Sequence, residues 1–151
     1  MPQRLVLLSL LTACAGAASN TDSGTPDTGD EPVGLEIAGA WSTVGVPLNM
    51  DIDELRLEKT WTNGAPADGY EVITWDNDTG TLIVLGDADS FDAGEYLKFS
   101  WVVQSDSTWW CESVGYGSQA DAEAATDPDA SAPSTSGCAM FGGAWWELQP
   151  R

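Results

Sequence analysis

The chain has 151 residues, of which 24 are acidic and 5 are basic, so its formal net charge is −19. A negative field of this size disfavours nucleic acid and anionic surfaces as partners, because both carry the same sign of charge. The sequence contains no histidine, which excludes Ser-His-Asp and Cys-His catalytic groups and every zinc site with a histidine ligand.

The first fourteen residues combine an early positive charge, an apolar run and a cysteine. Arg4 precedes a mainly apolar run at 5–11, and Leu11-Thr12-Ala13-Cys14 follows from it. These four residues resemble the lipobox of bacterial lipoproteins. The resemblance implies export, cleavage that removes a signal peptide at 1–13, and attachment of diacylglycerol to Cys14. The alternative is an ordinary secretory signal; the run is too short to span a bilayer, which needs about 20 residues.

Residues 14–34 contain no aromatic side chain and consist mainly of small, polar and acidic residues. Such a segment buries too little apolar surface to offset the entropy cost of ordering it, so we expect a disordered acidic tether behind the lipid anchor. All aromatic residues follow Gly34. The remaining stretch, 35–151, is long enough for one domain with its own core.

The domain opens with alternating apolar and polar residues, and Gly39-Ala40-Trp41 lies within this first strand. Its Gly-x-Trp pattern resembles the one that opens lipocalin-like barrels. The resemblance implies that the glycine admits a close turn and that Trp41 plugs one end of a barrel. It also implies that Arg151 is the basic residue that covers this tryptophan. A core tryptophan in an unrelated β-domain is the alternative.

Most of the domain alternates with a period of two, which is typical of half-buried strands. Two predicted strands place these apolar residues on one face: Leu55, Leu57 and Trp61 in the first, and Leu97, Phe99, Trp101 and Val103 in the second. Further strands are predicted at 70–76, 81–85, 107–116 and 144–148. We expect an all-β fold of seven or eight antiparallel strands, either a small lipocalin-like barrel or a sandwich.

One short helix is predicted at 119–125. Ser118 is its expected N-cap, and Asp121 is the expected partner in a capping box. Polar turns at 63–66, 76–80 and 87–94 separate apolar runs and indicate hairpins.

Three cysteines are an odd number. If Cys14 carries lipid, then Cys111 and Cys138 remain, and export to an oxidising compartment favours a disulfide between them. We expect this bond to hold the strand at 144–148 beside the strand that contains Cys111. Two free thiols are the alternative.

Eight tryptophans are many for a domain of this size, and four of them form the doublets Trp109-Trp110 and Trp145-Trp146. Neighbouring strand residues point to opposite faces, so we expect one tryptophan of each doublet at the surface or rim. Exposed indole rings beside acidic residues would bind sugars or an apolar ligand. The alternative is that all four pack beneath the loop at 118–137.

Oxygen-rich turns supply candidates for calcium, at Asp76 and Asp78 in one turn and Asp87 and Asp89 in another. Neither turn matches the EF-hand pattern, and solvated turns are the alternative. Without histidine, the enzyme chemistry that stays open is carboxylate chemistry, such as cleavage of a glycosidic bond between two acids about 5–10 Å apart. No catalytic residue stands out, and no cofactor is expected.

The sequence therefore predicts an exported, lipid-anchored β-domain that is not an enzyme and binds a small ligand, a glycan or an envelope protein. Ala15 stands where enterobacterial lipoproteins retained at the inner membrane have aspartate, which favours the outer membrane. A carboxylate-dependent hydrolase of the glycosidase type is the alternative. A buried acid in a cleft would favour the enzyme, whereas an open aromatic patch without one would favour binding.

Overall fold

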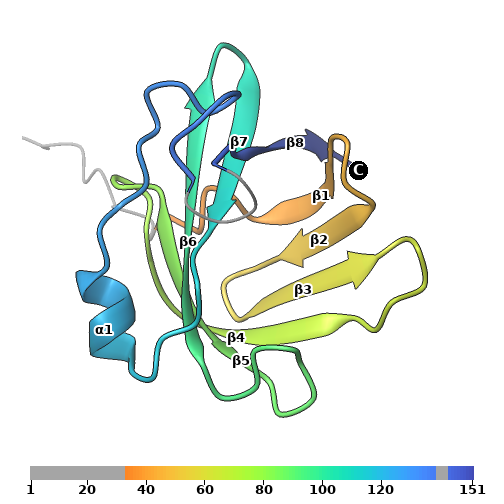
Figure 1. The fold of residues 1–151 in the computed structure, drawn as a ribbon, viewed down its shortest axis with the longest axis vertical. Helices are drawn as coiled ribbons and strands as arrows, with labels where there is room; N and C mark the ends of the chain where they lie inside the picture. Colours follow the sequence, from red (N-terminus) through yellow and green to blue (C-terminus); the bar gives the residue numbers. More distant parts are fainter. Residues whose placement is uncertain (1–32, 139–142) are drawn as a thin grey trace, which may run out of the picture. The chain divides into compact units, whose positions relative to one another are not determined.

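The structure, a computed structural model, describes residues 33–138 and 143–151, where eight antiparallel strands close into a barrel (Figure 1). Each strand pairs with the next along the chain, and the last returns to pair with the first. The strands are β1 (Gly39–Thr43), β2 (Leu48–Ile52), β3 (Arg56–Trp61), β4 (Asp68–Asp76), β5 (Thr81–Gly86), β6 (Tyr96–Gln104), β7 (Ser107–Glu112) and β8 (Trp146–Pro150). The predicted all-β fold is confirmed, and it is a barrel and not a sandwich.

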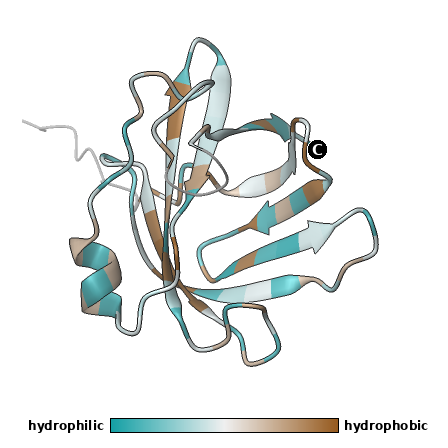
Figure 2. Ribbon diagram, viewed as in Figure 1, coloured by the Kyte–Doolittle hydropathy of each residue, from teal (hydrophilic) through white to brown (hydrophobic). Residues whose placement is uncertain are grey.

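Alternation along each strand separates the inside of the barrel from its outside, and it produces the banding along the ribbon in Figure 2. Leu97, Phe99 and Trp101 of β6 are all buried in the barrel core. The Phe99 ring stacks on Trp110 of β7 with 4.7 Å between ring centroids, and it meets the edge of Tyr70 at 6.1 Å. A row of large rings therefore fills the centre of the barrel.

Two residues that were predicted to face the core are exposed. Leu55 is 74% exposed because it lies in the turn before β3 begins at Arg56. Val103 is 60% exposed, since the pairing of β6 with β5 ends at Ser100 and the rest of β6 continues as a hairpin with β7 alone.

The segment 33–38 crosses one end of the barrel before β1 begins. Leu35 and Ile37 are 5% and 2% exposed and belong to the barrel core. Asn77, in the β4–β5 turn, accepts the backbone N–H of Glu36 at 3.0 Å and donates to the carbonyl of Gly34 at 2.9 Å. We call this end, which also carries the β2–β3 and β6–β7 turns, the strapped end. The opposite end is the mouth end.

Gly39 and Trp41 pack together near the strapped end. Gly39 has a φ of 147°, which L side chains rarely adopt, and a Cβ there would lie 3.4 Å from the Trp41 ring nitrogen. Trp41 is half-buried against the core and donates its indole N–H to the carbonyl of Ile37 at 2.9 Å. Arg151 pairs with both carboxylate oxygens of Asp51, at 2.5 and 2.6 Å. The resemblance to lipocalin-like barrels stays a prediction.

Between β7 and β8 the chain crosses the outer face of β5 and β6, where it forms α1 (Gln119–Ala124). Ser118 is the N-cap: its Oγ accepts the N–H of Asp121 at 3.2 Å and donates to the Asp121 carboxylate at 2.7 Å. The predicted helix and its cap are confirmed. Among the described residues, no helix has the length and apolar character needed to cross a membrane.

A disulfide joins Cys111 and Cys138, with 5.6 Å between their Cα atoms, as predicted. Both cysteines are buried in a second apolar cluster on the outside of the barrel, together with Trp145 and the half-buried Trp109. β8 lies beside β7, with Trp110 opposite Trp146. The disulfide thus ties the described part of the crossover segment, 113–138 and 143–145, to the barrel wall.

Candidate functional site

A cavity of about 520 Å³ opens at the mouth end of the barrel, between the β3–β4 loop, the β5–β6 loop and the start of β8. Its volume is in the range of small-molecule sites, which is about 300–1,000 Å³. We call it the mouth cavity. Among the described residues, its lining includes three aromatic rings, four carboxylates and one amine, which belong to Trp61, Phe91, Trp146, Asp68, Asp89, Asp92, Glu112 and Lys59.

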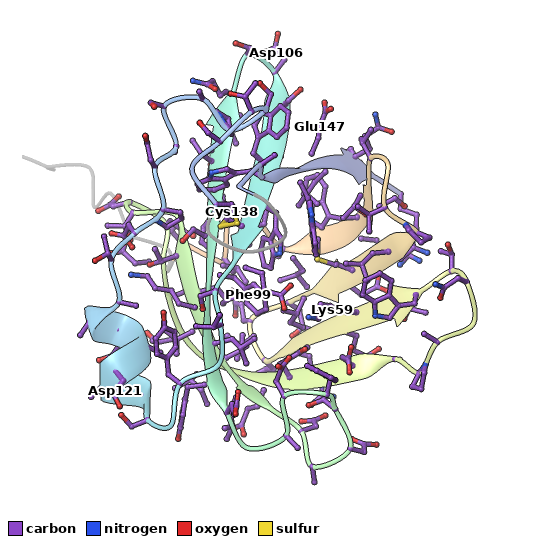
Figure 3. The ribbon with its side chains drawn as sticks, in the orientation of Figure 1. Lys59, Phe99, Asp106, Asp121, Cys138 and Glu147 are labelled. Atoms are coloured by element: carbon purple, nitrogen blue, oxygen red, sulfur yellow. A yellow bond between two sulfur atoms is a disulfide. The ribbon has the colours of Figure 1, made fainter. Side chains whose placement is uncertain are left out.

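The floor of the mouth cavity is a buried ion pair. Lys59 follows Leu57 by two residues in β3, and Glu112 follows Trp110 by two residues in β7, so alternation turns both side chains into the barrel. The Lys59 Nζ donates to Glu112 Oε1 at 2.7 Å, and the two side chains are only 7% and 6% exposed. Figure 3 shows Lys59 and Phe99 near the centre of the barrel.

The Lys59 ammonium also contacts aromatic rings. Its Nζ lies 4.8 Å from the ring centroid of Tyr70 and 5.7 Å from that of Phe99, so the π faces of both rings help to stabilise the buried charge. Ion pairing and ring contacts together hold this cation at a fixed position below the cavity.

Glu112 keeps one oxygen unsatisfied. Its Oε2 is buried and has no hydrogen-bond partner among the described residues. Burial raises the pKa of Glu112 above its ordinary value, although the neighbouring Lys59 ammonium opposes the rise. A carboxyl group in this state can accept a hydrogen bond from a ligand, or it can hold a proton and donate one.

Tyr70 and Asp92 form a second polar contact at the cavity. The Tyr70 hydroxyl donates to Asp92 Oδ2 at 2.9 Å. Burial, followed by this hydrogen bond, raises the pKa of Tyr70 far above its ordinary value, so the phenol stays protonated and acts as a donor. The contact fixes Asp92 at the wall of the cavity.

The rim of the cavity is aromatic and held in place. Phe91 is 91% exposed at the tip of the β5–β6 loop, and its backbone N–H donates to Asp68 Oδ1 at 2.9 Å. In the same loop, Ser90 Oγ donates to the carbonyl of Asp87 at 2.9 Å. An exposed ring on a hydrogen-bonded loop is a ready contact surface for an incoming ligand.

The two indoles of each tryptophan doublet lie on opposite sides of the barrel wall, as predicted, but none of the four is exposed. Trp110 is 1% exposed inside the barrel, and Trp145 is 4% exposed in the disulfide cluster. Trp109 is half-buried beside that cluster, and Trp146 is half-buried at the mouth cavity. The four indoles therefore do not form one platform, because the barrel wall lies between them. Trp146 is the doublet residue that reaches the candidate site.

The aspartates considered for calcium have other partners. Asp76 Oδ1 accepts the backbone N–H of Asp78 at 2.8 Å and that of Thr79 at 3.3 Å, and the Thr79 contact is the main cause that lowers the pKa of Asp76. Asp87 binds Arg56 through two hydrogen bonds of 2.9 and 2.6 Å, and Asp89 lines the mouth cavity. Within 33–138 and 143–151, no group of three or more acidic or cysteine side chains is placed to hold a metal ion.

A second cavity, of about 320 Å³, lies outside the barrel beneath the crossover segment. Its one lysine, Lys98, is already engaged, since Nζ donates to the carbonyl of Ala125 at 3.0 Å and pairs with Asp127. Glu112 borders this cavity as well, but its side chain reaches Lys59, which lines the mouth cavity and not this one. The mouth cavity is therefore the better candidate.

Sequence reasoning did not identify Lys59 or Glu112 as site residues. A signal for the first was present, because Lys59 stands between Leu57 and Trp61 on the inward face of a strand whose apolar residues had been recognised. Glu112 lies two residues after Trp110 in β7, so the side chains of both residues point to the inside of the barrel. The predicted lipobox and Cys14 lie outside the described residues.

Comparisons with protein-family models, with characterised proteins and with solved structures give no match to this chain.

Proposed function

We propose that this protein binds a small organic ligand in the mouth cavity and acts through binding, not catalysis. The observation that carries the proposal is the mouth cavity itself: an aromatic rim above a buried Lys59–Glu112 pair with one unsatisfied carboxylate oxygen. Aromatic walls supply contact area at little entropic cost, and a few fixed polar groups orient a ligand. A glycan or an envelope protein that inserts a side chain would use the same rim.

The proposal places this barrel at a membrane surface. Leu11-Thr12-Ala13-Cys14 supports export and lipid attachment at Cys14, and Ala15 supports the outer membrane as the destination. Intact mass of protein extracted from membranes should show loss of residues 1–13 and an added diacylglycerol. A soluble product without acyl mass would contradict this anchoring.

The binding proposal is tested with N-phenyl-1-naphthylamine, an uncharged dye that fluoresces in apolar sites. We expect saturable fluorescence enhancement at one site per protein. Ala65→Trp should abolish it, because Ala65 is an exposed residue of the cavity lining where an indole would fill the opening.

Leu55→Trp is the matched control, since it adds an indole at an exposed position of the strapped end. It should bind the dye like the wild type. No saturable enhancement, or equal binding by both variants, would refute the proposal.

A second candidate function is a carboxylate-dependent hydrolase of the glycosidase type. It is favoured by Glu112, a buried acid with a raised pKa in a cavity that also contains Asp92. It ranks second because Lys59 already binds Oε1 of Glu112, and this contact opposes the raised pKa that a general acid needs. Release of 4-nitrophenol from 4-nitrophenyl glycosides, lost in Asp92→Asn, would establish the hydrolase instead of the binding protein.

A further inference from the structure

The charges at the mouth cavity are unbalanced. Its lining includes four acidic side chains and one ammonium, that of Lys59. The formal charge of the lining is −3 when all are ionised and −2 when Glu112 holds a proton. Either value attracts a cation and repels an anion. The whole chain, at −19, adds a field of the same sign that raises the local concentration of cations.

The buried Glu112 adds an observation that does not depend on this charge count. Its carboxylate is 6% exposed, one oxygen binds Lys59, and the other has no partner among the described residues. The side chain lies inside the barrel, because it reaches Lys59, which lines the mouth cavity. Oε2 is thus a buried acceptor at the cavity floor, and an N–H donor from a ligand would satisfy it.

The surrounding rings suit the same kind of ligand. Tyr70 and Phe99 already hold the Lys59 ammonium over their faces at 4.8 and 5.7 Å, so the barrel interior stabilises a cation in this way. Trp61 and Phe91 place further rings on the cavity wall and rim. A ligand with an apolar body and a positive head would contact the rings with its body and the acids with its head.

We infer that the mouth cavity binds an organic ammonium ion, whose N–H groups donate to Glu112 Oε2 while its apolar body packs against Trp61 and Phe91. The inference rests on the proposed function and names the ligand class. A bare metal ion fits less well, because no group of acidic side chains in the described ranges is placed to coordinate one. A carboxylate ligand would have to displace Glu112 from Lys59 within a negative field.

Three probes with the same phenylethyl framework test the inference: 2-phenylethylamine, uncharged 2-phenylethanol and anionic 3-phenylpropanoate. Each is titrated against the purified protein loaded with N-phenyl-1-naphthylamine, and dye displacement is measured. We expect the amine to bind at least about tenfold more tightly than the alcohol, and the acid not to bind.

Two variants assign the preference to the cavity. Lys59→Met/Glu112→Leu replaces both charges by apolar groups, which avoids leaving one buried charge alone; it should bind the dye and the alcohol but lose the preference for the amine. Asp89→Asn, at an exposed position of the lining, should weaken binding of the amine about threefold and leave binding of the alcohol unchanged. Asp106→Asn, in the turn at the strapped end, is the matched control and should bind like the wild type.

The outcomes separate a failure of the cation inference from a failure of the proposed binding function. If dye and alcohol bind but the amine binds no tighter, or if the acid binds best, the cation inference fails while the proposed binding function stands. If the double variant keeps the amine preference, the assignment to Glu112 fails. If no probe and no dye binds, the proposed function itself fails.

Discussion

The two ends of the barrel are built from different chemistry. At the strapped end, Leu35 and Ile37 bury apolar side chains in the core, and Asn77 fixes the backbone that carries them. At the mouth end, Lys59 and Glu112 occupy inward positions of the same kind, although an apolar residue there would complete the core.

Burying an ion pair rarely adds net stability, because desolvation cancels most of the attraction between the charges. The strapped end therefore serves stability, whereas the mouth end keeps polar groups that a core does not need. Substitutions at the two ends should therefore change stability and ligand binding separately.

The largest expected effect comes from breaking the buried pair. Glu112→Ala leaves the Lys59 ammonium without its partner, and we expect the free energy of unfolding to fall by about 3–5 kcal/mol in urea denaturation. Lys59→Met/Glu112→Leu should be at least as stable as the wild type. Equal damage in the single and double variants would show that the site needs its charges to fold.

The same pair predicts a pH dependence. Because burial raises the pKa of Glu112, the folded protein holds this proton to higher pH than the unfolded chain does. The contribution of Glu112 to stability is therefore complete below its unfolded pKa, about 4.3, and is lost as pH rises through the folded pKa. Lys59→Met/Glu112→Leu lacks this loss, so its stability relative to the wild type should increase as the pH rises above the unfolded pKa of a glutamate, about 4.3. A constant difference would contradict the raised pKa.

The disulfide tests a region outside both ends. Cys111→Ala/Cys138→Ala should lower the free energy of unfolding by roughly 3–4 kcal/mol, the entropy cost of a loop of about 28 residues. Dye binding at the mouth cavity should persist, because the disulfide lies on the outer face of the barrel. Loss of binding in a variant that remains folded would couple the crossover segment to the mouth.

A pair of small substitutions separates the two ends directly. Ile37→Val at the strapped end should cost about 1 kcal/mol and leave dye affinity unchanged. Phe91→Ala at the mouth end should weaken dye binding several-fold. It should change the free energy of unfolding by less than about 0.5 kcal/mol, because Phe91 is almost fully exposed. The reverse pattern would mean that the ends are wrongly assigned.

The smallest expected effect concerns the exposed ion pair of Arg56 and Asp87, whose side chains are 40% and 29% exposed. Asp87→Asn should cost about 0.2–1 kcal/mol, and less at high salt. The Arg56 hydrogen bond lowers the pKa of Asp87, so this contribution is present above the unfolded pKa and is lost as pH falls through the folded one. The contribution of Asp87 to stability thus changes with pH in the opposite direction to that of Glu112. Thermal unfolding of the wild type and of Asp87→Asn at acid and neutral pH measures this change.

Strand alternation predicted much of the barrel, including the face of Leu97, Phe99 and Trp101, and cysteine counting predicted the disulfide. The mouth cavity was missed for a physical reason. Lys59 and Glu112 lie 53 residues apart in the sequence, and only barrel closure brings them together. A charged residue at an inward position also looks like a break in the pattern until its partner is known.

The tryptophan doublets show the limit of local rules in another way. Alternation correctly assigned opposite faces to neighbours, yet it could not tell which outward face the crossover segment covers. Trp145 is buried outside the barrel because Pro133 and Asp129 of that segment bind its backbone and indole N–H groups. Trp146 reaches the mouth cavity because β8 begins there.

Amide chemical-shift mapping during titration with 2-phenylethanol tests most directly whether the mouth end is the binding end. We predict saturable shifts confined to the loops at 62–67 and 87–95 and to the residues around Glu112. The turns at 53–55, 77–80 and 105–106 should not move. Shifts centred on those turns or on the crossover segment, or no saturable shift at all, would contradict the account.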